Sequence, residues 1–265
     1  QSTAVGVPFP TLLSQQNILP GIKVDMKTYP LAGSPEEQIT EGLDGLRDRL
    51  KEYASLGAKF TKWRAVITID TQKSYPTDYC VHVNAHALAR YAALSQEAGL
   101  VPIVEPEVLM DGGHSIDDCY QATKRTLIRV FEELKIQRVA LDGMVLKPNM
   151  VIDGTASQPK SAPEKIADYT IRCFNETVPT ELPGIVFLSG GQTEPEACAN
   201  LNALNRSGQA LPWQLSFSYG RALQDSTLKA WGGKPENIAA AQSAFLHRAK
   251  LTSAARMGQY DVSME

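Results

Sequence analysis

Lys147 is the residue of this chain whose position points most directly to chemistry. It ends the apolar run from Val139 to Leu146, and Pro148 follows it at once. Because proline cannot donate to a sheet ladder, a strand through this run must end at Lys147. In chains that alternate strands and helices, catalytic side chains usually lie at the carboxyl ends of strands. Lys147 is therefore the first candidate for an amine nucleophile.

A nucleophilic lysine needs help from its neighbours. The amine is protonated near neutral pH, so desolvation in a buried site or a nearby cation must lower its pKa. Lys62 and Arg64 are candidates for that cation. An imine between Lys147 and a ketone would act as an electron sink, and its proton transfers require a carboxyl group, which Glu105 and Glu107 offer. The two glutamates also suit a salt-bridge network with the lysines, and both roles are compatible.

Two glycine-containing turns follow predicted strands near the end of the chain. The first is Ser189-Gly190-Gly191 and the second is Ser218-Tyr219-Gly220-Arg221. Glycine lets a backbone approach a ligand closely, and barrels often hold a phosphate in the loops after their last two strands. Alone, the first segment is better explained as a plain tight turn. The two turns together with the Arg221 side chain predict a phosphate site.

The chain alternates predicted strands and helices. Six short apolar segments closed by turn signals predict strands at 21–25, 60–69, 101–108, 139–147, 185–189 and 215–220. Helical spacing follows the start signal at 34–37 and continues at 84–98, 115–134, 163–178, after Thr193, after Arg221 and at 236–250. Ser115 with Asp118 forms a capping box, and Ser161 is the predicted cap of the helix at 163. The alternation predicts a single α/β domain over residues 1–265, with a parallel sheet.

The charges in these strands share one face. Side chains two residues apart point the same way, which pairs Lys23 with Asp25, Lys62 with Arg64, and Glu105 with Glu107, each pair at the close of its strand. A solvated strand end explains any one pair, but several together favour a closed (β/α)8 TIM barrel with the charges in its mouth. An open sheet would press them against apolar helices. The cations, joined by Lys147 and Arg221, outnumber the carboxylates, so a small anion such as phosphate is the expected ligand.

Composition excludes several classes of function. The chain has 265 residues, 43% hydrophobic and 21% charged, with a net charge of −3 and no basic tail, so nucleic-acid binding is not expected. No apolar run reaches the roughly 18 residues of a membrane span, and no secretory signal opens the chain, so we expect no membrane association and a cytoplasmic or organellar location. Cys80, Cys119, Cys173 and Cys198 lack Cys-x-x-Cys spacing and are predicted to be reduced packing residues.

Six segments in order carry a family resemblance: GIKVD, KWR, VPIVEPE, LKPNM, FLSGGQ and FSYGRAL. In combination they resemble class I fructose-bisphosphate aldolase from about residue 20 onwards. The resemblance implies a (β/α)8 barrel that reversibly cleaves fructose 1,6-bisphosphate to dihydroxyacetone phosphate and glyceraldehyde 3-phosphate in glycolysis and gluconeogenesis, through a lysine Schiff base and without a metal or other cofactor. It further implies a homotetramer located in the cytoplasm or the plastid stroma.

The resemblance also implies roles for the candidate residues. Lys147 would form the Schiff base and Glu105 would be the main general acid/base, supported by Lys62 and Glu107. Lys23 and Arg64 would face one phosphate. The phosphate on the ketone half would be held by the two turns, through Ser189, Gly190, Gly191, Ser218, Gly220 and Arg221. GIKVD corresponds to the third strand of the family, so two β/α units, on the order of 60 residues, are expected upstream, and residues 1–265 alone are expected to be an incomplete barrel that folds poorly.

Other functions remain open from the residues themselves. His82 and His86 are four apart on a predicted helix, but the residues between them lack the glutamate of a zincin motif, and no metal site is predicted. A transaldolase-like enzyme or a deoxyribose-phosphate aldolase would use the same lysine chemistry, whereas cations for two phosphates favour a bisphosphate substrate. A sugar-phosphate-binding protein without activity is the alternative from another class, and the intact set of Lys147, Glu105 and Lys62 argues against it.

Overall fold

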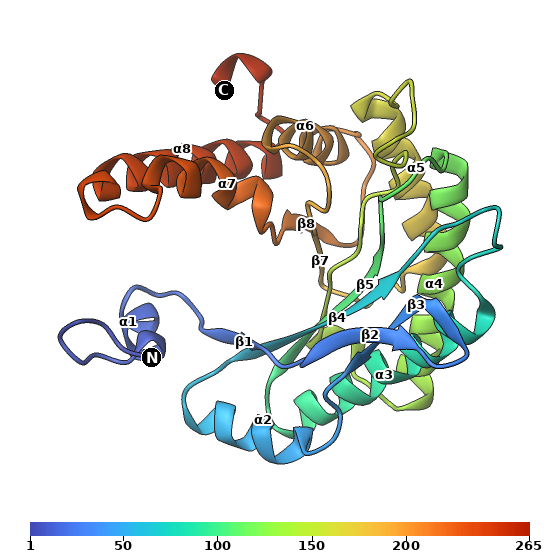
Figure 1. The fold of residues 1–265 in the computed structure, drawn as a ribbon, viewed down its shortest axis with the longest axis horizontal. Coiled ribbons are helices and arrows are strands. Elements are labelled where there is room, and N and C mark those ends of the chain that lie inside the picture. Colours follow the sequence, from blue (N-terminus) through green and yellow to red (C-terminus); the bar gives the residue numbers. More distant parts are fainter.

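The computed structural model describes residues 1–265 and assembles the six predicted strands into one sheet (Figure 1). The strands lie in the order β1 (Gly21–Lys23), β4 (Phe60–Ile67), β5 (Val101–Val108), β6 (Val145–Leu146), β7 (Gly184–Phe187) and β8 (Gln214–Phe217). Every neighbouring pair is parallel. Since β1 and β8 are both edge strands, the sheet is open, and it is a TIM-barrel-like α/β arrangement rather than a closed ring.

Helices connect the strands. They are α1 (Phe9–Gln15), α2 (Leu46–Ser55), α3 (Asp78–Glu97), α4 (Ile116–Ile136), α5 (Pro163–Thr177), α6 (Glu194–Asn205), α7 (Arg221–Trp231) and α8 (Ile238–Arg256). Figure 1 shows α3, α4 and α5 following one another around the outside of the sheet, with α6, α7 and α8 beside β7 and β8. None of the helices has the length and apolar character needed to cross a membrane.

Local capping signals explain where several helices begin. The predicted capping box at α4 is present: Ser115 accepts from the N–H of Asp118, and the Asp118 carboxylate accepts from the N–H of Ser115. Thr193 and Glu196 form a second capping box at α6. The predicted cap of α5 was wrong. Ala162 occupies the N-cap position and has no side chain that could cap α5, while Ser161 lies one residue earlier and its N–H donates to Asp153 in the preceding loop.

The predicted helix start at 34–37 was also wrong. Residues Ser34–Glu41 form β3, which pairs antiparallel with β2 (Lys27–Leu31) as a separate hairpin, and the helix begins only at Leu46. A tertiary contact explains the difference. The Glu37 carboxylate is fully buried and accepts hydrogen bonds from the N–H and the hydroxyl of Thr77, at the start of α3. These bonds hold β3 against the start of α3.

The sheet separates apolar from charged residues by strand parity. Trp63, Val104, Leu146 and Ile185 lie on one face in matching register and are fully buried. Trp63 stacks on Tyr91 of α3, which identifies this face as the one covered by helices. The side chains that alternate with these residues point to the opposite face, where the candidate site lies. Most of the buried apolar residues, 53 in all, form one continuous cluster.

Candidate functional site

The Glu105 carboxylate is the centre of the site. One of its oxygens lies 2.9 Å from the Lys62 amine and the other lies 3.2 Å from the Lys147 amine. The side chains of Glu105, Lys62 and Lys147 are only 4%, 19% and 13% exposed. A single buried carboxylate therefore bridges two nearly buried amines, one of which is the predicted nucleophile.

Strand neighbours bring these three residues together. Glu105 lies on β5 between β4, which carries Lys62, and β6, after which Lys147 follows directly. The Lys147 N–H donates to the Val104 carbonyl at 2.8 Å, so the backbone of Lys147 remains tied to β5 although β6 has already ended. The predicted strand at 139–147 was too long: residues Leu141–Gly143 form a 3-10 turn and only Val145–Leu146 pair with the sheet. The strand ends at Leu146, one residue before the predicted end, so Lys147 is the first residue after it.

A second charged group lies toward β1. Arg64 forms an ion pair with Glu107 across β4 and β5. Burial opposes the charge of Arg64, but Glu107, with Glu105 and Asp25, raises the pKa of Arg64 above its ordinary value. Asp25 pairs with the exposed Lys23, lies 3.8 Å from the Lys62 amine, and accepts from the Arg64 N–H at 3.2 Å.

Asp25 was predicted only as one of the charges on the shared face, and its contacts were not expected. Its side chain is only 5% exposed, and it links Lys23 on the edge strand to Lys62 in the centre. Its parity with Lys23 in GIKVD placed it on the charged face, but its contacts with Lys62 and Arg64 depend on the pairing of β1 with β4. The expectation that each charged pair closes its strand was wrong for β4, where Ala65–Ile67 continue the strand beyond Lys62 and Arg64.

Each carboxylate of the site is paired with a lysine or an arginine. Glu105 pairs with Lys62 and Lys147, Glu107 with Arg64, and Asp25 with Lys23. Such an arrangement is suited to proton transfer and to anion binding. It differs from the sets of free carboxylate or imidazole ligands that bind metals.

The two glycine turns meet at the carboxyl ends of β7 and β8. Gly190 adopts a left-handed backbone with φ of 55°, which favours glycine, and its carbonyl accepts from the Arg221 guanidinium at 2.6 Å. Ser189 is buried, whereas Gly220 and Arg221 are exposed at the start of α7. The Ser218 N–H donates to the Phe187 carbonyl, which holds the second turn against β7. The N–H groups of Ser189 and Gly190 form no hydrogen bond within the chain.

Other predicted features lie away from this site. His82 and His86 do share one side of α3, and both contact Glu133 of α4, with ring nitrogen to carboxylate distances of 3.4 and 3.0 Å. Arg129 pairs with the same carboxylate at 3.0 Å. The four cysteines are free and buried, as predicted.

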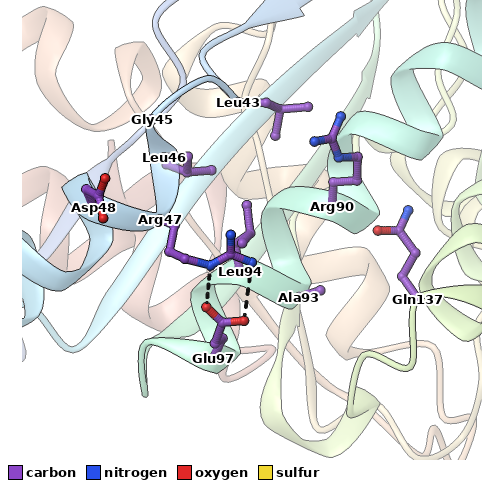
Figure 2. Close-up of a pocket in the computed structure, with 10 residues that line it drawn as sticks. All are labelled: Leu43, Gly45, Leu46, Arg47, Asp48, Arg90, Ala93, Leu94, Glu97 and Gln137. Atoms are coloured by element: carbon purple, nitrogen blue, oxygen red, sulfur yellow. Dashed lines mark hydrogen bonds and ion pairs between the residues drawn. The ribbon is translucent and has the colours of Figure 1, made fainter.

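A groove between α2 and α3 is also separate from the site. Figure 2 shows Arg47 of α2 paired at two points with Glu97 of α3 across it. None of the predicted catalytic or substrate-binding residues lines this groove.

Comparisons with known proteins agree on one family. The model of the glycolytic family, described as fructose-bisphosphate aldolase class-I, matches residues 1–265. A cytoplasmic fructose-bisphosphate aldolase isozyme of Pisum sativum is 53% identical over 98% of this chain and 72% of its own length. A probable class 1 enzyme of Xylella fastidiosa is 52% identical over 98% of this chain and 77% of its own.

A solved structure is similar as well. The fructose-bisphosphate aldolase of Plasmodium falciparum, in a ternary complex with TRAP and a small-molecule inhibitor, superposes with a TM-score of 0.96 at 49% identity. The match covers 98% of this chain and 75% of that one.

Proposed function

The chain belongs to the class I fructose-bisphosphate aldolase family, and we propose that Lys147 is its Schiff-base lysine and Glu105 its main general acid/base. As a member of this family the chain is a lyase that reversibly cleaves fructose 1,6-bisphosphate to dihydroxyacetone phosphate and glyceraldehyde 3-phosphate. The observation that carries the assignment is the 3.2 Å contact between the Lys147 amine and the buried Glu105 carboxylate.

Glu105 is positioned to move the protons of imine chemistry. The Lys147 amine gives up a proton to the neighbouring carboxylate and then attacks the ketone carbon of the substrate. The resulting carbinolamine loses water when a carboxyl group protonates its hydroxyl, which leaves the protonated imine. Cleavage of the bond between the carbons α and β to the imine sends its electron pair into that imine and leaves an enamine, while a base removes the proton of the β hydroxyl that becomes the aldehyde. Glu105 lies next to the amine on which all these steps depend.

Lys62 and Glu107 support this chemistry without carrying it. Lys62 lies 2.9 Å from one oxygen of the Glu105 carboxylate and holds the other oxygen toward the Lys147 amine. Glu107 lies two residues after Glu105 on β5. It forms an ion pair with Arg64 and adds a second negative charge to this face of the sheet.

We assign the two phosphates of the substrate to two separate binding sites. We assign the phosphate on the ketone half to the turns of Ser189, Gly190, Gly191, Ser218, Gly220 and Arg221. Free N–H groups at Ser189 and Gly190 and the exposed Arg221 guanidinium support this assignment. We assign the second phosphate to Lys23 and Arg64, which lie beyond Lys62 on β1 and β4.

Borohydride trapping tests the proposal directly. The protein is incubated with dihydroxyacetone phosphate, reduced, and digested, and the adduct is located by mass spectrometry. We expect the label on Lys147. Lys147→Met should carry none, whereas Lys51→Met, a matched change at an exposed lysine of α2, should label like the wild type. A label on any other lysine, or trapping by Lys147→Met, would refute the assignment of the nucleophile, and strong inhibition by a chelator would refute a metal-independent reaction.

We further propose a cytoplasmic homo-oligomer in which residues 1–265 form one domain. The single continuous apolar core supports one domain, and the name of the Pisum sativum relative supports the compartment. The homotetramer is suggested by the family resemblance alone. Light scattering coupled to gel filtration measures it: a mass four times that of the chain is expected, and a monomer would contradict it.

A further inference from the structure

Met110 lies against the phosphate turn although it belongs to a distant part of the chain. It follows β5 by two residues and is only 4% exposed. Its thioether sulfur accepts from the Gly191 N–H at 3.1 Å. Its methyl group occupies the space in which a side chain on Gly190 would begin.

The backbone of Met110 is itself fixed. The N–H of Leu109 donates to the Ile67 carbonyl at 2.9 Å, and the Met110 carbonyl accepts from the Thr155 N–H at 2.7 Å. These two bonds tie Met110 to β4 on one side and to the loop after Lys147 on the other. The sulfur therefore reaches the turn from a rigid support.

The turn is held differently at its carbonyls and at its N–H groups. The Gly190 carbonyl accepts from Arg221, and the Ser189 carbonyl accepts from the side chain of Gln192 at 3.1 Å. Of the N–H groups in the turn, that of Gly191 donates to a side chain, and the acceptor is the Met110 sulfur. A thioether is a weak, uncharged acceptor, so it orients the turn without placing a negative charge beside an anion site.

We propose that Met110 is a positioning residue for the phosphate on the ketone half: it holds the Ser189–Gly191 turn in its anion-binding conformation while leaving the N–H groups of Ser189 and Gly190 free. This inference rests on the proposed function of the turn. Met110 does not touch the reacting atoms and acts through Gly190 and Gly191.

Borohydride trapping of the imine at Lys147, carried out with two different ketones, tests this role. Met110→Leu keeps an apolar side chain of similar volume and removes the sulfur acceptor. We expect the concentration of dihydroxyacetone phosphate that gives half-maximal borohydride trapping to rise roughly three- to tenfold, the range for loss of one hydrogen bond. Trapping by dihydroxyacetone, which lacks the phosphate, should be unchanged. The matched control is Met144→Leu, the same substitution at a fully buried methionine outside the turn, and it should leave both values unchanged.

Each outcome decides the question. An equal loss with both ketones, or an effect of Met144→Leu as large as that of Met110→Leu, would show a general packing role and overturn the proposal. A Met110→Leu protein with unchanged half-saturation for both ketones would overturn it too. Wild-type protein that traps neither ketone at Lys147 would instead contradict the proposed function of the site.

Discussion

The buried triad of Lys62, Glu105 and Lys147 makes a strong prediction about unfolding free energy. Glu105→Gln removes the shared anion, which leaves the 13% exposed Lys147 without a counter-charge and the 19% exposed Lys62 with only the more distant Asp25, at 3.8 Å. Lys62→Met removes one amine, and Glu105 keeps its contact with Lys147. The first change should therefore be the more destabilising of the two. Both variants and the double variant are compared by urea unfolding.

The magnitude follows from the 2.9 Å distance between Lys62 and Glu105. At an effective dielectric constant of about 20, two unit charges at that distance attract by roughly 5–6 kcal/mol before desolvation is subtracted. Loss of a buried partner typically destabilises by about 3–5 kcal/mol, which we expect for Glu105→Gln. Lys62→Met should destabilise by about 1–3 kcal/mol, because Glu105 retains one amine. The double variant should be more stable than the sum predicts by about 2–3 kcal/mol.

An exposed pair provides the control for this cycle. Lys73 and Glu36 lie closer together, at 2.6 Å, but both side chains are about half exposed. Water and salt screen such a pair, so Lys73→Met and Glu36→Gln should combine additively within experimental error. The reasoning is refuted if the Lys62 and Glu105 changes are additive to within about 0.5 kcal/mol, or if the exposed pair shows the larger coupling.

Four further predictions concern caps and buried groups. Ser115→Ala should lower the unfolding free energy by about 1 kcal/mol, because α4 loses its capping box. Hydrogen bonds from Ser115 lower the pKa of Asp118, so its stabilisation is complete above the ordinary carboxyl pKa of about 4 and is lost as the pH falls through the lowered value; the difference between wild type and Asp118→Ala should shrink in acid melts as the pH falls below about 4. Glu37→Ala should destabilise by about 1–3 kcal/mol in urea, since it leaves donors of Thr77 unpaired, and a neutral effect would contradict the tertiary role of this carboxylate. Burial raises the pKa of Cys119 to about 11, so at pH 8 only about one thiol in a thousand is ionised and a disulfide reagent should react slowly until urea exposes it; rapid labelling of the folded chain would contradict this.

Strand parity predicted the charged face because it depends only on local geometry. Side chains two apart in a strand must point the same way, so Lys62 with Arg64, and Glu105 with Glu107, shared a face before any strand order was known. The choice of partners needed the sheet itself. Glu105 contacts both lysines because β5 lies between β4 and β6, and that order comes from long-range packing.

Features decided by distant contacts were not predictable from local patterns. The segment beginning at Ser34 carries a good helix-start pattern, yet it forms β3 because Glu37 binds Thr77, forty residues away along the chain. Met110 shows the same limit. Nothing around position 110 indicates that its sulfur reaches Gly191, eighty-one residues later, because that contact depends on how the ends of β5 and β7 face each other.

The pairing of charges suggests an order in which an anionic substrate engages the site. Lys23, Lys62, Arg64 and Lys147 are each already paired with a carboxylate, whereas Arg221 contacts only a neutral carbonyl. A phosphate at the Arg221 turn therefore gains a charge-assisted contact without displacing a carboxylate. A phosphate at Lys23 and Arg64 must compete with Asp25 and Glu107 for the same cations. The ketone half is thus expected to bind first, which brings the carbonyl to Lys147 before the far phosphate is held.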